Sequence, residues 1–164
     1  MKKILKILLI AVIFLFITYL LYAFTLEERV LLSIKIENYI PIFAKTDKED
    51  THGGFRNEGE LLKKIYFSEK QANNFVKQVK ENANWRELPI TERLYNKVCK
   101  YAMNKNMNIP EVSDGYWFVL DRHSESKDKY NEGNIFDVNR HSYNFTVAVF
   151  DTDKNILYVY ELDT

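Results

Sequence analysis

The stretch SYNFTVAVFDTDKNILYVYELDT, residues 142–164, contains the strongest fold signal in the sequence. Two runs rich in β-branched and aromatic residues, YNFTVAVFD and ILYVYELD, flank a short polar segment. Such residues fit the pleated surface of a sheet, and Asn155 in the connection suits a left-handed turn position. The stretch therefore predicts an antiparallel β-hairpin.

Two further segments upstream have the same character. GYWFVLDRH, residues 115–123, is rich in aromatic and β-forming residues and predicts a third antiparallel strand, and LLKKIYF, residues 61–67, predicts a short one. Apolar residues occur on both faces of the three C-terminal strands. One face is therefore expected to pack on helices and the other on further chain.

Two helices are predicted between these strands. The first begins at a capping box, Ser68 to Gln71, and the second opens at Pro89 and Thr91. Their apolar residues recur at helical spacing: Ala72, Phe75, Val76 and Val79 in the first, and Leu94, Tyr95, Val98, Tyr101 and Ala102 in the second. The predicted fold class is α+β, with two helices packed on a small antiparallel sheet with a C-terminal β-hairpin, preceded by one N-terminal transmembrane helix.

The N-terminal segment MKKILKILLIAVIFLFITYLLYAFTLEER supplies that last element. It has no charged residue from Ile7 to Leu26, a run of about 20 residues that spans about 30 Å as a helix, the thickness of the bilayer hydrocarbon. A cleaved secretion signal would have a shorter apolar region and small residues before the cut. Leu21 stands two positions before Ala23, which fits such a site poorly. The sequence therefore favours a retained membrane anchor over a cleaved signal.

The charges beside the run predict its orientation. Lys2, Lys3 and Lys6 precede it, and the positive-inside rule keeps them in the cytoplasm. The rest of the chain is then expected outside the cell membrane, as an extracytoplasmic domain. Without these lysines, 20 basic residues face 23 acidic residues, a net charge of about −3, which argues against nucleic acid as a partner.

The remaining organisation follows from composition. Residues 44–60, AKTDKEDTHGGFRNEGE, are polar and glycine-bearing, which is typical of a linker or mobile loop. The residues just before, VLLSIKIENYI, fit helix and strand about equally well. We therefore divide the chain into a membrane anchor (1–29), a neck (30–60) and an extracytoplasmic α+β domain (61–164).

Each of the three histidines has an acid nearby in the sequence. If the strands of residues 115–123 and 142–151 pair with Trp117 opposite Val147, then His123 lies opposite His141, with Asp121 on the same face. His52 could reach the same place from the glycine-bearing segment. The hypothesis is a divalent metal site, with zinc as one candidate, formed by His52, Asp121, His123 and His141.

Ordinary solvent-facing histidines at strand ends explain the same pattern, because the spacings match no compact metal motif. Apart from such a metal ion, the sequence indicates no cofactor. Cys99, the single cysteine, falls on a helical apolar pattern and is interpreted as a buried, inert thiol. There is no phosphate loop and no serine-nucleophile motif, so the sequence favours a binding domain over an enzyme.

Four segments, DTHGGF, KIYFSEKQANNFV, GYWFVLDRHS and SYNFTVAVFDTDKNILYVYELDT, together resemble a family of small, uncharacterised membrane-anchored proteins of Gram-positive bacteria. The resemblance covers roughly residues 50–164. It implies a bacterial surface setting and no particular reaction, substrate or ligand.

The leading functional hypothesis is a single-pass membrane protein with a binding domain outside the cytoplasmic membrane, directed at an envelope protein or peptide. A sheet edge or the long loop from Ser124 to Arg140 would make the contact. Two alternatives stay open: a metal-dependent hydrolase acting outside the membrane, and an accessory subunit of a membrane complex.

Overall fold

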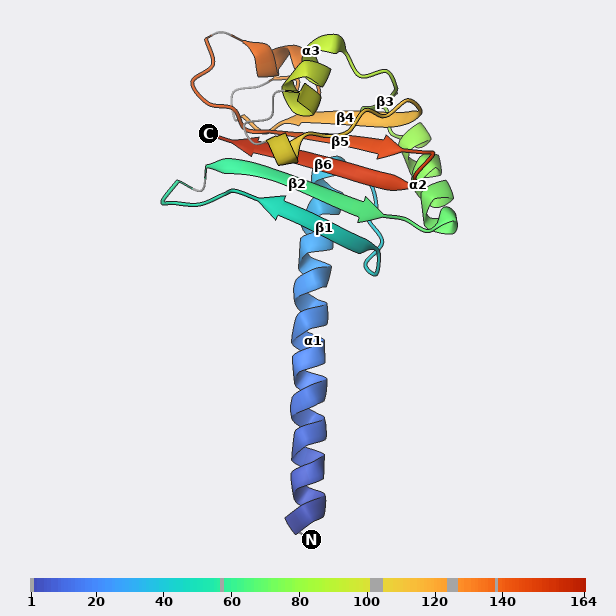
Figure 1. Cartoon of the computed structure of the whole chain (residues 1–164), viewed down its shortest axis with the longest axis vertical. Coiled ribbons are helices and arrows are strands. Elements are labelled where there is room, and N and C mark those ends of the chain that lie inside the picture. Colours follow the sequence, from blue (N-terminus) through green and yellow to red (C-terminus); the bar gives the residue numbers. More distant parts are fainter. Residues whose placement is uncertain (1, 57, 101–104, 124–126, 138) are drawn as a thin grey trace.

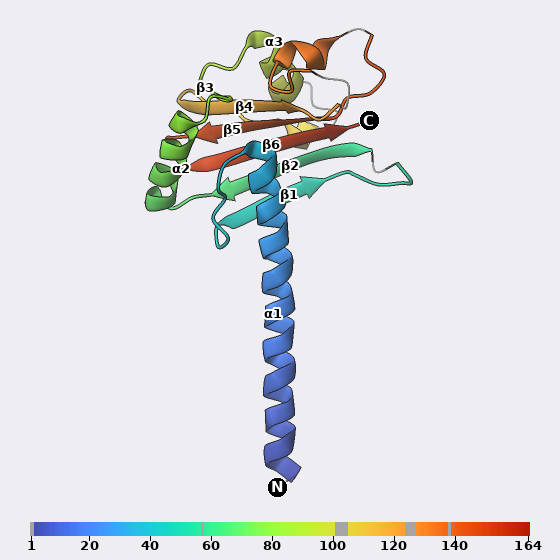
Figure 2. The same cartoon turned by 180° about the vertical axis from the view of Figure 1, so that it is seen from behind.

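The computed structural model describes residues 2–56, 58–100, 105–123, 127–137 and 139–164. One long helix, α1 (Lys2–Ile36), carries a folded domain at its C-terminal end (Figures 1 and 2). We call residues 37–164 the head domain. Residues 3–36 of α1 form a helix long and apolar enough to cross a membrane, and its most apolar stretch is not covered by any part of the described chain.

The head domain is built on a six-stranded antiparallel sheet within the described residues, in the order β1-β2-β6-β5-β4-β3. The strands are β1 (Lys45–Asp50), β2 (Gly59–Tyr66), β3 (Trp85–Glu87), β4 (Gly115–Asp121), β5 (Phe145–Asp151) and β6 (Ile156–Asp163). Strands and helices form one mixed domain, and the predicted α+β fold is confirmed.

The predicted C-terminal hairpin forms the centre of this sheet. β5 and β6 pair antiparallel from Phe145 opposite Leu162 to Asp151 opposite Ile156. The turn between them places Asn155 at φ 55°, the left-handed position expected for it. Every residue of β5 is buried, because the strand has neighbours on both edges and both faces.

The first predicted helix is confirmed as α2 (Glu69–Glu81). Its capping box is complete: the Ser68 side chain accepts from the Gln71 amide, and the Gln71 side chain accepts from the Ser68 amide. The second begins as α3 (Glu92–Tyr95), capped by Thr91, and continues as a π-helical turn, η1 (Asn96–Lys100). Tyr101 and Ala102 of its expected apolar stripe lie outside the described residues. Two short 3₁₀ helices, η2 (Lys105–Met107) and η3 (Glu132–Phe136), complete the described helical elements.

Apolar residues cover both faces of the sheet, as the sequence predicts. On one face, the end of α1 and the buried side of α2 pack on the sheet through residues that include Leu32, Ile36, Phe75, Phe150 and Leu157. On the other face, α3, η1, η2 and η3 pack on it through residues that include Leu94, Val98, Met107, Ile135 and Tyr160. The sheet is therefore the middle layer of the head domain.

The segment expected as a neck, residues 30–60, differs from the expectation of a linker. α1 continues to Ile36, because Leu32 and Ile36, four residues apart, bury their side chains against the sheet. Lys45–Asp50 then forms the edge strand β1, paired with β2 along its whole length. The predicted mobile loop was wrong for this strand, since backbone hydrogen bonds hold it although its side chains are polar and exposed.

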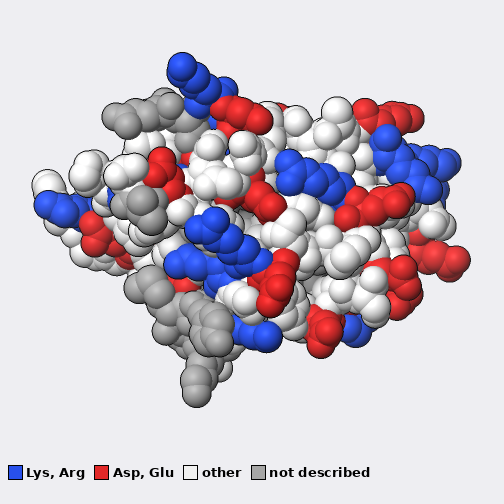
Figure 3. Space-filling model, turned by 90° about the horizontal axis from the view of Figure 1, so that it is seen from above, with Lys and Arg blue, Asp and Glu red and all other residues white. Residues whose placement is uncertain are grey.

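Basic and acidic side chains are interspersed on the face of the head domain that lies opposite the N-terminal part of α1 (Figure 3). Such a mixture is typical of a solvated surface.

Candidate functional site

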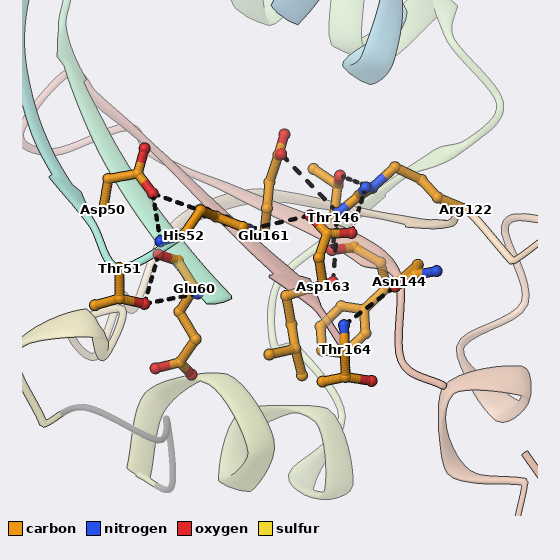
Figure 4. Close-up of polar contacts among 12 residues, drawn as sticks. Asp50, Thr51, His52, Glu60, Arg122, Asn144, Thr146, Glu161, Asp163 and Thr164 are labelled. Atoms are coloured by element: carbon orange, nitrogen blue, oxygen red, sulfur yellow. Dashed lines mark hydrogen bonds and ion pairs between the residues drawn. The ribbon is translucent and has the colours of Figure 1, made fainter. Parts of the chain in front are cut away.

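Charged side chains converge where β1 and β6 end, at one corner of the sheet (Figure 4). The His52 ring lies between two carboxylates, with Nδ1 2.7 Å from Asp50 Oδ1 and Nε2 3.1 Å from Asp163 Oδ2. The pairing of β2 with β6 creates this contact, because it brings the end of β6 beside the residues that follow β1. His52 therefore joins the β1–β2 connection to the C-terminal end of β6.

Arg122, directly after β4, extends this arrangement. Its Nη1 donates to Asp163 Oδ1 at 2.7 Å, and its Nε donates to Thr146 Oγ1 at 3.1 Å. Its Nη2 lies 3.9 Å from Glu161 Oε2, and Glu161 in turn accepts from Lys35 Nζ of α1 at 2.9 Å. We call this set the charge network: Lys35, Asp50, His52, Arg122, Glu161 and Asp163. It connects α1 to three strands of the head domain.

The electrostatics of the charge network favour the ionised form of Asp50. Burial opposes ionisation of Asp50, but hydrogen bonds from the His52 amide and ring and from Lys48 outweigh it and lower the pKa of Asp50 to about 2. Both ring nitrogens of His52 already contact carboxylates. The arrangement therefore holds the fold together, and it does not present His52 as a base to a substrate.

A polar cavity of about 490 Å³ adjoins the charge network. Its walls offer donors and acceptors side by side, from Arg56, Glu58, Arg122, Asn144, Asp163 and Thr164. Arg122 and Asp163, which both line it, are paired directly with each other. A ligand here would meet mixed charge, which suits a peptide-like or zwitterionic group.

A second polar site lies at the end of β4. Asp121 accepts from Arg140 in a two-bond ion pair, and its Oδ1 also accepts from the His123 amide at 3.0 Å. An open cavity of about 510 Å³ beside them is lined by His123, Lys127, Asp128, Asn134, Asp137, Asn139 and Arg140. Both carboxylate oxygens of Asp121 thus accept from the Arg140 guanidinium, whereas the metal-site hypothesis needs them to bind a metal ion.

The four residues of that hypothesis do not converge on one point. Asp121 and His123 lie together at the end of β4, where Asp121 is paired with Arg140. His52 belongs to the charge network, and His141 is exposed. In the part of the chain that the structure describes, no group of three or more His, Cys, Asp or Glu side chains is arranged to hold a metal ion.

The strand register behind the hypothesis was wrong. Trp117 pairs with Val149 and Val119 with Val147, two residues from the predicted partners, and β5 begins only at Phe145. A shift of two residues leaves every side chain on its expected face, so the apolar pattern fits both registers. His141 lies before the strand and does not oppose His123.

Cys99 is half-buried on η1, and burial raises the pKa of its thiol to about 12, with Glu111 adding to the effect. This agrees with the interpretation as an inert thiol.

The sheet also presents an open edge. β1 pairs with β2 on one side, and no strand of the described residues pairs with its other side. All six residues of β1 are exposed. Figure 1 shows this edge turned toward the part of α1 that leaves the head domain.

Sequence reasoning missed Arg122, Glu161, Asp163 and Arg140 as members of polar clusters. Arg122 lies between Asp121 and His123, two residues of the metal-site hypothesis. The charged residues at the ends of predicted neighbouring strands could therefore have indicated it. Comparison of the chain with protein-family models, curated proteins and solved structures finds no match.

Proposed function

We propose that this protein is a single-pass membrane protein whose head domain lies outside the cytoplasmic membrane and binds an extended peptide segment along β1. The observation that carries the proposal is the open β1 edge beside a helix of membrane-spanning character. An exposed edge strand can add a strand from a partner through main-chain hydrogen bonds.

The orientation rests on charge. Lys2, Lys3 and Lys6 lie at the end of α1 away from the head domain, and cytoplasmic flanks of membrane helices are enriched in such residues. At the other end of the uncharged run, Arg29 is the single basic residue within the first three positions, against three lysines at the N-terminal end. This difference supports a head domain on the outer side.

The backbone of β1 is ready for an added strand. The Thr51 amide donates to Glu60 O at 2.9 Å, and the Gly53 amide donates to Glu58 O at 3.3 Å. The backbone amides of odd-numbered residues therefore point toward β2. Because pairing alternates along an antiparallel strand, the amides of Thr46 and Lys48 point to the open side.

The side chains of β1 limit which strand can be added. Asp47 and Glu49 are two residues apart and share a face, and five of the six residues are charged. Charged residues protect an edge from indiscriminate pairing. A partner strand with Lys or Arg at alternating positions would place opposite charges across the pair. The proposed ligand is therefore an extended segment with alternating basic residues.

Site-specific photocrosslinking of the full chain in intact cells tests this proposal. A photoreactive residue at Glu49 is expected to capture a partner, and one at Lys77, exposed on α2, is the matched control and is expected to capture none. Lys48→Pro removes an outward amide while sparing the ladder with β2, so it is expected to abolish the Glu49 adduct. An adduct that persists in Lys48→Pro, or equal adducts from Glu49 and Lys77, would refute edge binding.

A further inference from the structure

A groove runs between α1 and the segment that follows it. It has a volume of about 410 Å³, and its walls are mainly apolar, with Leu26, Val30 and Ile34 from one side of α1 and Tyr39 and Ile42 opposite them. We call it the helix groove. Four polar residues, Arg29, Ser33, Glu37 and Asn38, also line it. The Glu37 carboxylate already accepts from Asn84 and Tyr130.

Arg29 is 7% exposed and only partly satisfied. Its Nη2 donates to Ala44 O at 2.9 Å and lies 3.3 Å from Thr46 Oγ1, but its Nη1 has no hydrogen-bond partner among the described residues. Glu28, the adjacent acid, is paired with Lys63. Within the described chain no carboxylate forms an ion pair with Arg29. Burial lowers the pKa of Arg29, and the charge of the nearby Glu28 opposes this effect without a direct ion pair. A buried guanidinium with an unpaired Nη1 is unfavourable, so an anion bound in the groove would stabilise it.

Asn38, in the same groove, is a second buried residue with an unpaired donor. It is 4% exposed, and its Oδ1 accepts from Asn82 Nδ2 at 3.1 Å. Its own Nδ2, like Arg29 Nη1, is a buried donor with no acceptor in the described part of the chain. Buried donors are normally paired. The helix groove therefore combines apolar walls with two donors that need acceptor oxygens.

The depth of the groove relates it to the membrane surface. Arg29 follows Leu26, the last residue of the uncharged run, by three positions, or about 4.5 Å along a helix. The headgroup layer extends roughly 5 to 8 Å beyond the hydrocarbon on each side. Phe43 of the head domain is 84% exposed, and its ring centroid lies 6.2 Å from that of Tyr22 within the run. Aromatic rings favour this boundary, so Arg29 lies at the level of lipid phosphates and esters.

We propose that the helix groove binds a phospholipid of the leaflet on the side of the head domain. An acyl chain lies along Leu26 and Val30, and the phosphate and ester oxygens accept from Arg29 and Asn38. Arginine suits this role because its planar donors match phosphate oxygens. The inference rests on the proposed membrane anchoring, and it adds a specific lipid site to it.

The test uses the full chain reconstituted in vesicles of phosphatidylglycerol and phosphatidylcholine. The chain carries a diazirine residue at Val30, which lines the groove, or at Leu31, its neighbour outside the groove; their exposures are similar, 48% and 54%. After a delipidating detergent wash and illumination, mass spectrometry identifies the adducts. A phospholipid adduct is expected at Val30, and at least a severalfold smaller one at Leu31.

Two variants test the role of the donors. Arg29→Gln removes the cation and Asn38→Asp replaces a donor by an anion while keeping the acceptor for Asn82; each is expected to reduce the Val30 adduct severalfold. Asn38→Asp decides the question if Arg29→Gln fails to fold. Equal adducts at Val30 and Leu31, insensitivity to Asn38→Asp, or a chain-to-chain adduct at Val30 would overturn the lipid site alone. Failure of the wild-type chain to float with vesicles would overturn the anchor as well.

Discussion

Asp121 and Arg140 form an ion pair that is closed to solvent. Arg140 Nη2 lies 2.7 Å from Asp121 Oδ1 and Nη1 lies 3.0 Å from Oδ2, with side-chain exposures of 4% for Arg140 and 0% for Asp121. Arg140 also donates to Asn134 O at 3.1 Å, so the pair joins the end of β4 to the segment around η3. The buried ion pair therefore fixes the segment before β5 to the end of β4.

Breaking this pair from one side is expected to destabilise the head domain strongly. Arg140→Met leaves the buried carboxylate of Asp121 without its cation, which lowers the free energy of unfolding by about 3 to 5 kcal/mol. Arg56→Met is the matched control: its pair with Glu58 is exposed, so its removal changes stability by less than about 1 kcal/mol. Urea unfolding of the full chain in detergent measures both, and equal effects would contradict the structural role of the buried pair.

Asp50 is expected to make stability depend on pH in the acid range. The pKa of Asp50 is lowered from 3.8 to about 2, so its ionised form stabilises the folded state above about pH 4, and that contribution is lost as the pH falls toward about 2. Asp50→Asn is therefore expected to be less stable than wild type at pH 7, with a difference that shrinks between pH 4 and 2. Thermal unfolding across this range, with Glu49→Gln as control, measures it; a difference independent of pH would count against the charge network.

Gly115 permits the close contact that aligns β4 with β5. A Cβ atom at this position would lie 1.8 Å from Phe150 O, and φ is 145°. Gly115→Ala is expected to lower the free energy of unfolding by more than about 2 kcal/mol. Gly54→Ala, where a Cβ meets no atom within 4 Å and φ is 71°, is expected to lower it by only about 1 kcal/mol. Denaturant midpoints of the two variants test this, and similar values would show that the contact is unimportant.

The central hairpin and the first helix could be predicted because their signals are local. Two runs of β-branched and aromatic residues with Asn155 in the turn specify β5 and β6, and Ser68 with Gln71 specifies the start of α2. The β4–β5 register could not be chosen from the pattern, because side chains repeat every two residues and a shift by two changes no face. In the structure Gly115 pairs with Asp151, a long-range contact with no local signal.

β1 escaped prediction for a related reason. KTDKED has no apolar residue, so nothing in its pattern indicates a sheet; it is held by its backbone pairing with β2. The same limit applies to the site. The sequence places Asp50 next to His52, but the second carboxylate, Asp163, is 111 residues away and arrives only through the pairing of β2 with β6.

The claim on which the account depends is that α1 crosses the membrane with the head domain outside. A single cysteine at Phe55, fully exposed in the β1–β2 connection, or at Lys3, each in a Cys99→Ser background, can be treated with a membrane-impermeant maleimide on intact protoplasts. The account predicts labelling at residue 55 without lysis and at residue 3 only after lysis. Labelling at residue 3 on intact protoplasts, with residue 55 protected until lysis, would contradict it.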